Sequence, residues 1–203
     1  MTVRHTSIIP EICGLDESGR GALAGPLVGA AVIFAKPLRP GSRIAGVPLR
    51  DGKTLSPGQR RRIYEWLLRQ GAGIYTETVP VSAINRRGIQ HANVRVFMSL
   101  MRRIPSQLYF IDGRLKLPHR INGRAVISRP KADTTVSQVI LAGIVAKVVR
   151  DEIMSGLHLA HPHYGWITNM GYGTDAHVRA LLRFGPTSHH RSLFVRTAIS
   201  KRL

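Results

Sequence analysis

The chain has 203 residues, 43% of them hydrophobic, and its 30 Lys and Arg against 11 Asp and Glu give a formal net charge of +19. This length suits one domain, or one with a small appendage, and the apolar content argues against a disordered basic tail. The charge, and the lack of any apolar run of membrane-spanning length, argue against a protein that crosses a bilayer. We expect a polyanion as the partner.

The basic residues are mostly arginine, with 24 Arg and 6 Lys. A guanidinium matches phosphate geometry bidentately, whereas an ammonium acts as a point charge. Nucleic acid is therefore the leading substrate class, and its binding should fall steeply with salt. The alternative is that the excess reflects a high-salt, thermophilic or GC-rich-genome background.

The single cysteine, Cys13, excludes an internal disulfide and a zinc knuckle. Residues 1–21 contain no long apolar segment, so we expect neither a signal peptide nor a membrane anchor. Both observations indicate a reducing cytoplasm.

Two apolar, β-rich stretches open the chain, from Ile12 to Leu15 and from Leu27 to Phe34. The glycine-dense connection from Gly19 to Pro26 predicts that they form a hairpin of two strands. Residues 37–55 carry Pro, Gly and basic residues without periodicity and predict a loop.

A helix is predicted from 57 to 70, because Ser56 is a typical N-cap before Pro57, and Gly71 ends it. A third strand is expected from Ala72 to Val79.

A short turn is expected from Val81 to Arg86, followed by a helix from about 89 to 103 whose apolar positions recur at helical spacing. Short strands are predicted at Leu108–Ile111 and at Ala125–Ile127.

The longest helical pattern runs from Thr134 to Leu159, and a further helix is predicted from His177 to Arg183. Early strands with interleaved helices favour an α/β domain with a mixed sheet flanked by helices. We expect residues 1–155 to form this core and residues 156–203 to form a mostly helical appendage packed on it.

Acids are scarce in so basic a chain, and several lie at the ends of predicted elements. Asp16 and Glu17 close the first strand, Asp112 closes the strand at Leu108–Ile111, and Asp133 precedes the long helix. Mg²⁺ and Mn²⁺ take oxygen ligands and bridge acidic side chains to phosphate. Two such ions roughly 3.5 to 4 Å apart can activate a water and stabilise the leaving oxygen of a phosphoryl displacement. The pattern indicates metal-dependent phosphodiester hydrolysis.

Each acid also has a structural interpretation. Asp112-Gly113 is typical of an ordinary turn, and Asp133 is typical of an N-cap. Adjacent Asp16 and Glu17 would point to opposite faces of a regular strand, so both reach one metal pair only if the strand ends or bends there.

The run from Gly14 to Pro26, GLDESGRGALAGP, closely resembles the signature G-V-D-E-A-G-R-G-P-L-A-G-P of the ribonuclease HII family. Further blocks follow in family order and reach residue 194: Asp112-Gly113, Lys131-Ala132-Asp133, Ala146 to Asp151, Gly171 to Thr174 with His177, and His190 to Phe194.

The resemblance implies a ribonuclease H-like mixed sheet and an endoribonuclease with Mg²⁺ or Mn²⁺ as cofactor. Its substrates would be RNA-DNA hybrids and single ribonucleotides embedded in duplex DNA. Cleavage on the 5′ side of the ribonucleotide would leave a 3′-hydroxyl and a 5′-phosphate. Carried over residue by residue, the catalytic, metal-holding carboxylates would be Asp16, Glu17, Asp112 and Asp133.

The resemblance also implies a substrate-binding set. Gly19-Arg20-Gly21 matches the element whose backbone approaches the ribose, and Tyr172 matches a tyrosine beside the junction sugar. Lys53 occupies the place of a phosphate-contacting lysine. Only the 2′-hydroxyl distinguishes RNA from DNA at one site, and glycine permits the close backbone approach that reading it requires.

Asp151 competes with Asp133 for the fourth carboxylate. If residues 134–151 form one unbroken helix, about 1.5 Å per residue separates the two by roughly 27 Å, too far for one metal site. We favour Asp133, which lies near the strand ends.

Four positions depart from the family pattern. Ser18 stands for Ala, Gly52 and Gly143 each stand for Ser, and Met170 stands for Lys. None removes a carboxylate, but Gly52 and Met170 leave the phosphate contacts less well defined.

We expect a monomer that acts on nucleic acid and not on a membrane; the sequence does not identify a protein partner. The alternative function is a noncatalytic, basic nucleic-acid-binding protein on the same scaffold.

Overall fold

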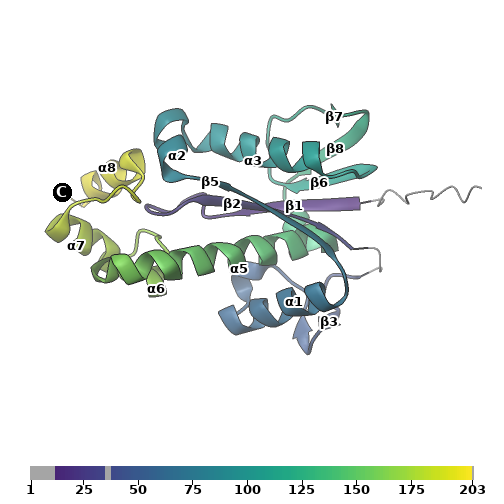
Figure 1. Cartoon of the computed structure of the whole chain (residues 1–203), viewed down its shortest axis with the longest axis horizontal. Helices are drawn as coiled ribbons and strands as arrows, with labels where there is room; N and C mark the ends of the chain where they lie inside the picture. Colours follow the sequence, from purple (N-terminus) through teal and green to yellow (C-terminus); the bar gives the residue numbers. More distant parts are fainter. Residues whose placement is uncertain (1–11, 35–37, 203) are drawn as a thin grey trace, which may run out of the picture.

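The computed structural model describes residues 12–34 and 38–202, and the expectation for the N-terminal segment falls largely outside them. Its centre is a six-stranded sheet in the order β5-β2-β1-β6-β8-β7, with a separate two-stranded sheet of β3 and β4 (Figure 1). The strands are β1 (Ile12–Ser18), β2 (Leu27–Ile33), β3 (Arg43–Ile44), β4 (Val47–Pro48), β5 (Gly73–Val79), β6 (Leu108–Asp112), β7 (Arg120–Ile121) and β8 (Arg124–Arg129).

Helices flank the sheet on both faces, as the expected mixed α/β class requires. The α-helices are α1 (Pro57–Arg69), α2 (Val81–Arg87), α3 (Ile89–Arg103), α4 (Ala132–Thr135), α5 (Ser137–Ala160), α6 (Trp166–Asn169), α7 (Asp175–Phe184) and α8 (Ser192–Ser200). Two short 3-10 helices, η1 (Gly52–Thr54) and η2 (Pro162–Tyr164), complete the described chain.

Two apolar layers hold the sheet. One lies beneath α2 and α3 and includes Val96 and Phe97, and the other lies beneath α1 and α5 and includes Ile63 and Ile144. Figure 1 shows α3 on one side of the sheet and α1 with α5 on the other. A third cluster, around Trp166, packs α6, α7 and α8 against the C-terminal part of α5.

The sheet register brings two of the sequence-predicted acids to one edge. β1 pairs antiparallel with β2, which confirms the expected hairpin, and it pairs parallel with β6. In the parallel pair Leu15 lies opposite Ile111, so Asp16 and Asp112 follow at the carboxyl ends of neighbouring strands. β8 then pairs parallel with β6 and leads to α4.

The predicted helix from Thr134 to Leu159 is wrong at its beginning. The chain forms a single turn, α4, becomes extended at Val136 and starts α5 at Ser137. The hydroxyl groups of Thr134 and Thr135 both donate to Lys131 O, at 2.8 and 3.1 Å. Such side-chain bonds compete with the helical backbone bonds and favour a break.

Two smaller expectations are also corrected. Residues 81–86, predicted as a turn, belong to α2, a helix too short to show a clear period, which Gly88 ends at a φ of 82°. The predicted loop 37–55 contains β3, β4 and η1 within its described part. The division expected at residue 155 stays a prediction, and α5 runs through that position.

No helix in residues 12–34 and 38–202 combines the length and apolar character needed to cross a bilayer.

The contact of β1 with α5 generates a test of the fold. A Cβ on Gly14 would lie 2.2 Å from Gln138 C and 2.3 Å from Val139 N, both of them backbone atoms that cannot rotate away. Gly14→Ala should therefore lower the free energy of unfolding by about 3 kcal/mol, the upper end of ordinary overpacking. The measurement is urea denaturation followed by circular dichroism.

Gly58→Ala is the matched control, because a Cβ at this exposed α1 position meets nothing within 4 Å. It should raise stability by up to about 1 kcal/mol through helix propensity. Equal stability of Gly14→Ala and the wild type would show that β1 and α5 are not in backbone contact.

Candidate active site

A polar hollow of about 320 Å³ lies at the carboxyl ends of β1 and β6. It brings together most of the residues predicted from the sequence: Asp16, Glu17, Gly19, Arg20, Gly21, Lys53, Asp112 and Tyr172. Its walls also contain residues that were not assigned to the site: Ser18, Asp51, Gly52, Gly143 and Lys147. Asp133 does not line the hollow, but its carboxylate Oδ2 lies 3.3 Å from Lys53 Nζ, so it stands at the rim.

Asp16 is held between β1 and the backbone of α5. Its Oδ1 accepts the Glu17 backbone N–H at 2.8 Å, and a Cβ on Gly143 would lie 2.3 Å from its Oδ2. Gly143 thus provides the space that this carboxylate fills, and a side chain at position 143 would displace the carboxylate from its place in this structure. Burial, followed by the charge of Glu17 and then that of Asp112, raises the pKa of Asp16 well above its ordinary value.

Glu17 faces the opposite side of β1. Its Oε1 accepts a 3.5 Å hydrogen bond from Asn93 Nδ2 on α3, and burial is the main reason that its pKa is raised. The condition that the strand must end or bend at these acids is not met, because β1 stays paired with β2 as far as Ser18. Both carboxylates nevertheless open into the same hollow.

Asp112 joins β6 to the start of α4. Its Oδ1 accepts the backbone N–H of Ala132 at 2.9 Å and that of Asp133 at 3.4 Å, so it caps this helical turn. The Asp133 side chain points to Lys53, which also lies 4.0 Å from Asp51. Burial and the Asp112 charge raise the pKa of Asp133, an effect that Lys53 partly offsets.

The excluded alternative, Asp151, lies elsewhere. Its Oδ2 accepts a hydrogen bond from Arg60 Nη2 at 2.9 Å, in an ion pair that joins α5 to α1. Although α4 is separate from α5, Asp133 remains beside Asp112 and Lys53, whereas Asp151 is far along α5.

The carboxylates fit a hard divalent cation by their chemistry and by their mutual repulsion. Asp16, Glu17 and Asp133 each have a raised pKa to which the charge of Asp112 contributes, so positive charge at this place would relieve all three. Within the described residues, no three acidic, histidine or cysteine side chains already converge as ligands of one ion. The carboxylates therefore lie near one another without forming a complete three-ligand site.

The glycines of the loop after β1 have different reasons to be glycine. Gly19 and Gly25 have φ angles of 93° and 83°, and a Cβ on them would collide with Arg150 and Met154 respectively. Gly21 differs, because a Cβ there meets nothing within 4 Å. Among the described residues, the backbone N–H groups of Gly19, Arg20 and Gly21 donate to no protein acceptor. The loop thus presents free donors to the hollow at its least obstructed point.

Tyr172 is fixed from two directions. Its ring lies 5.3 Å from the Arg150 guanidinium carbon, and its carbonyl oxygen is 2.9 Å from His177 Nδ1. These contacts hold the aromatic ring at the wall of the hollow without using the tyrosine hydroxyl.

The histidine behind Tyr172 belongs to a buried network with one consistent set of tautomers. Trp166 Nε1–H only donates, so His177 Nε2 accepts at 3.1 Å and Nδ1–H donates to Tyr172 O. His190 Nδ1 accepts the Thr187 N–H at 2.9 Å, which leaves Nε2–H to donate to His177 Nε2 at 3.1 Å. Both histidines are neutral in this arrangement, and burial lowers the pKa of both.

The sequence signal for the unassigned residues was weak but not absent. Lys147 follows Gly143 by four residues, which places both on one face of α5. Asn93 is fully buried on an otherwise apolar face of α3, and its Oδ1 has no hydrogen-bond partner among the described residues. Asp51 caps η1 and contacts Lys53, a relation that a residue pattern without a known loop conformation does not reveal.

The fold has well-matched relatives among solved structures. Ribonuclease HII of Archaeoglobus fulgidus, solved in complex with PCNA, superimposes with a TM-score of 0.76 at 23% identity, over 92% of this chain and 96% of that one. Bst-RNase HIII, solved in complex with Mn²⁺, superimposes with a TM-score of 0.69 at 21% identity, over 96% of this chain and 71% of that one. The mixed sheet is therefore that of the type 2 ribonucleases H.

Sequence comparison narrows this class. The family model described as Ribonuclease HII matches residues 13–198, and the Ribonuclease HII of Chlamydia trachomatis serovar L2 is 37% identical over 191 residues, which cover 91% of this chain and 82% of the relative. The chain belongs to the ribonuclease HII family. It is an endoribonuclease of the type 2 ribonuclease H class.

The buried Asp16 carboxylate predicts a stability cost in metal-free protein. Asp16→Asn removes a charge that burial and two neighbouring acids disfavour, while the amide oxygen can still accept the Glu17 N–H. In EDTA at neutral pH the variant should be more stable than the wild type by about 1 to 2 kcal/mol, the usual gain from relieving a strained functional site. Urea denaturation measures the difference.

Asp175→Asn is the control, because Asp175 is exposed and pairs with Arg202 on the surface. It should leave stability within about 0.5 kcal/mol of the wild type. A loss of stability in Asp16→Asn would contradict the description of Asp16 as a repelled, buried carboxylate.

The histidine network predicts acid sensitivity. Burial and the neighbouring histidines lower the pKa of His190 to about 4, so the unfolded chain binds this proton first as the pH falls. The contribution of His190 to stability should be complete above about pH 6.5 and should decline towards pH 4, by roughly 3 kcal/mol. Denaturation curves at several pH values should show a shallower decline in His190→Gln than in the wild type.

The exposed His119 supplies the control, since His119→Gln should keep the wild-type pH dependence. If the free energy of unfolding declined with pH equally in His190→Gln and in the wild type, His190 would not be held neutral in the fold.

Proposed function

We propose that the chain is a metal-dependent endoribonuclease that hydrolyses the phosphodiester on the 5′ side of a ribonucleotide, leaving a 3′-hydroxyl and a 5′-phosphate. Its substrates would be RNA-DNA hybrids and single ribonucleotides embedded in duplex DNA. The observation that carries the proposal is the gathering of Asp16, Glu17 and Asp112 in one hollow, with Asp133 at its rim, in a member of the ribonuclease HII family.

In this proposal the carboxylates of Asp16, Glu17, Asp112 and Asp133 hold the divalent cations, which are Mg²⁺ or Mn²⁺. The Mn²⁺ in the related Bst-RNase HIII supports this choice of metal class. Bound there, two cations would activate a water for in-line attack and stabilise the leaving oxygen. Asp112 would keep its orientation through the two N–H groups of α4 that it accepts.

The loop and its surroundings would bind the substrate. Gly21 is unobstructed, so the free N–H groups of residues 19–21 are accessible to a ribose 2′-hydroxyl, the one group that marks RNA at a single site. The Tyr172 ring would pack against the adjoining sugar. Lys53 and Arg20 lie on the walls and would contact phosphate, and Lys147 is a third cation there.

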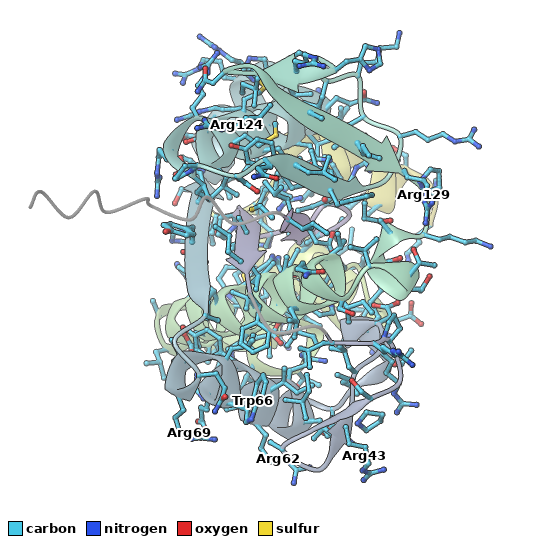
Figure 2. All side chains as sticks on the ribbon, turned by 90° about the vertical axis from the view of Figure 1, so that its right-hand side faces the viewer. Arg43, Arg62, Trp66, Arg69, Arg124 and Arg129 are labelled. Carbon is cyan, nitrogen blue, oxygen red and sulfur yellow. The ribbon has the colours of Figure 1, made fainter. Side chains whose placement is uncertain are left out.

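The positive charge would serve general binding. Basic side chains project from several elements, as Figure 2 shows for Arg43 on β3, Arg62 and Arg69 on α1 and Arg129 on β8. Such contacts to phosphate are independent of sequence and weaken with salt. Because one chain supplies every residue of the site, we propose that the enzyme acts as a monomer, in a reducing cytoplasm where the buried Cys13 remains a thiol.

The net charge of +19 would serve nucleic-acid binding with or without cleavage, so it does not separate the enzyme from a noncatalytic binding protein on the same scaffold. The two proposals make different predictions for one substrate, a labelled DNA duplex that contains a single ribonucleotide.

The wild type should cut this duplex once, 5′ of the ribonucleotide, with Mg²⁺ or Mn²⁺ and not with EDTA. Asp16→Asn should cut at least about a thousandfold more slowly, since one of the charge-stabilising groups is lost. Its affinity for the duplex should change less than about threefold, because binding depends mainly on phosphate contacts. Denaturing gels and fluorescence anisotropy provide the two readouts.

Retention of full activity by Asp16→Asn would refute the assignment of the carboxylates. A wild type that binds the duplex and never cuts it would support the noncatalytic alternative.

A further inference from the structure

Two arginines lie fully buried beneath the loop that follows β1. Arg150 on α5 and Arg191 at the start of α8 both have a relative exposure of 0%. Among the described residues neither forms an ion pair with a carboxylate, in contrast to Arg60, the third buried arginine, which pairs with Asp151. A buried charge without a counterion is costly, so its retention calls for a specific use.

Every nitrogen of the Arg150 guanidinium donates to a backbone carbonyl. Nε donates to Pro26 O at 3.1 Å, Nη2 to Ala24 O at 3.0 Å and Nη1 to Met170 O at 2.9 Å. The first two acceptors belong to the loop, and the third belongs to the turn that leads to Tyr172. Arg150 therefore joins the two segments that would read the ribose.

Arg191 repeats this arrangement from the other side. Its Nε and Nη2 donate to Gly25 O at 3.0 and 2.9 Å, and Nη1 donates to Arg20 O at 3.0 Å. The acceptor at Arg20 lies within the Gly19-Arg20-Gly21 element itself. Since these carbonyls turn inward, the free N–H groups of residues 19–21 remain available to the hollow.

The packing around Arg150 restrains the conformation of the loop. A Cβ on Gly19 would lie 2.0 Å from Arg150 Nε, so the loop backbone rests directly on the guanidinium. The Tyr172 ring stacks on the other part of the same group, 5.3 Å from its central carbon. Methionine in place of lysine at position 170 does not affect this contact, because Arg150 bonds only the backbone oxygen of that residue.

We infer that Arg150 and Arg191 are positioning residues for ribose recognition. By fixing residues 19–26 and 170–172 as one rigid surface, they set how strongly the enzyme prefers a ribonucleotide to a deoxyribonucleotide at the cleavage site. This inference rests on the proposed function. It assigns to the two arginines no contact with substrate.

Lysine is the informative replacement, because it keeps the charge but has one nitrogen in place of a planar fork, and it cannot reach three carbonyls that lie in different directions. Steady-state cleavage of the single-ribonucleotide duplex gives KM, and competition by the same duplex without ribose gives its inhibition constant. Arg150→Lys and Arg191→Lys should each raise KM about tenfold or more and change the inhibition constant less than twofold.

Hydrogen exchange followed by mass spectrometry reports the loop independently of activity. The N–H groups of Leu23 and Ala24 donate to Gly171 O at 2.8 and 3.1 Å, so peptides covering residues 19–26 should be protected in the wild type. In either lysine variant they should exchange faster, while peptides from α1 stay unchanged.

Leu67→Ala is the control for a general loss of stability, because Leu67 is fully buried between α1 and the sheet and touches neither loop. It should leave the ratio of KM to the inhibition constant unchanged. If one lysine variant fails to fold, the other tests the inference, since the two side chains come from different elements.

Faster hydrogen exchange of residues 19–26 in a lysine variant, with an unchanged ratio of KM to the inhibition constant, would overturn the inference. A parallel rise of KM and the inhibition constant would also overturn it. A wild type that shows no preference for the ribonucleotide would instead refute the proposed function, and the exchange data would still report whether the arginines anchor the loop.

Discussion

The close packing of β1 on α5 is the constraint on which the rest of the structure depends. Gly14 lets the strand touch the helix backbone. Two residues further along β1, the Asp16 carboxylate fills the space left open by Gly143 of α5. Along the same helix, Lys147 reaches the hollow and Arg150 lies beneath the loop after β1. Positions 143, 147 and 150 follow helical spacing, so one face of α5 supports the carboxylates, a basic wall residue and the ribose-facing loop together.

Charge is distributed in a way that opposes stability and suits the proposed chemistry. Acids are the minority in the chain, yet four of them line one hollow, where burial and mutual repulsion raise the pKa values of Asp16 and Glu17. Two guanidiniums are buried nearby and, within the part of the chain that the structure describes, have no carboxylate partner. A fold selected for stability alone would avoid both features, and functional sites are where such violations are expected.

Much of this arrangement could be predicted from the sequence. The hairpin, the helices at 57–70 and 89–103 and the mixed sheet are confirmed, because periodic burial, caps and glycines are local signals. The helix from Thr134 was wrong, since threonine side chains that bond Lys131 O interrupt a pattern that remains apolar and periodic. The four expected carboxylates lie near one another through strand register and capping, and their catalytic role stays a prediction.

Features that depend on contacts between distant segments could not be predicted. Arg150 and Arg191 lie in blocks that match the family, but the residue pattern does not show that they are buried or that they bond the carbonyls of residues 24–26 and 170. The same holds for Asn93, whose partner Glu17 comes from another element. The contact of Asp51 with Lys53 is local, but it depends on the conformation of an irregular segment. Long-range geometry, more than residue type, decides these assignments.

Anomalous scattering from a crystal soaked in Mn²⁺ would test the central claim most directly. The account predicts manganese peaks between the carboxylates of Asp16 and Asp112, within about 2.0 to 2.3 Å of their oxygens, and none in crystals of Asp16→Asn. Manganese bound only at other surface carboxylates, with the hollow beside β1 left empty, would contradict it.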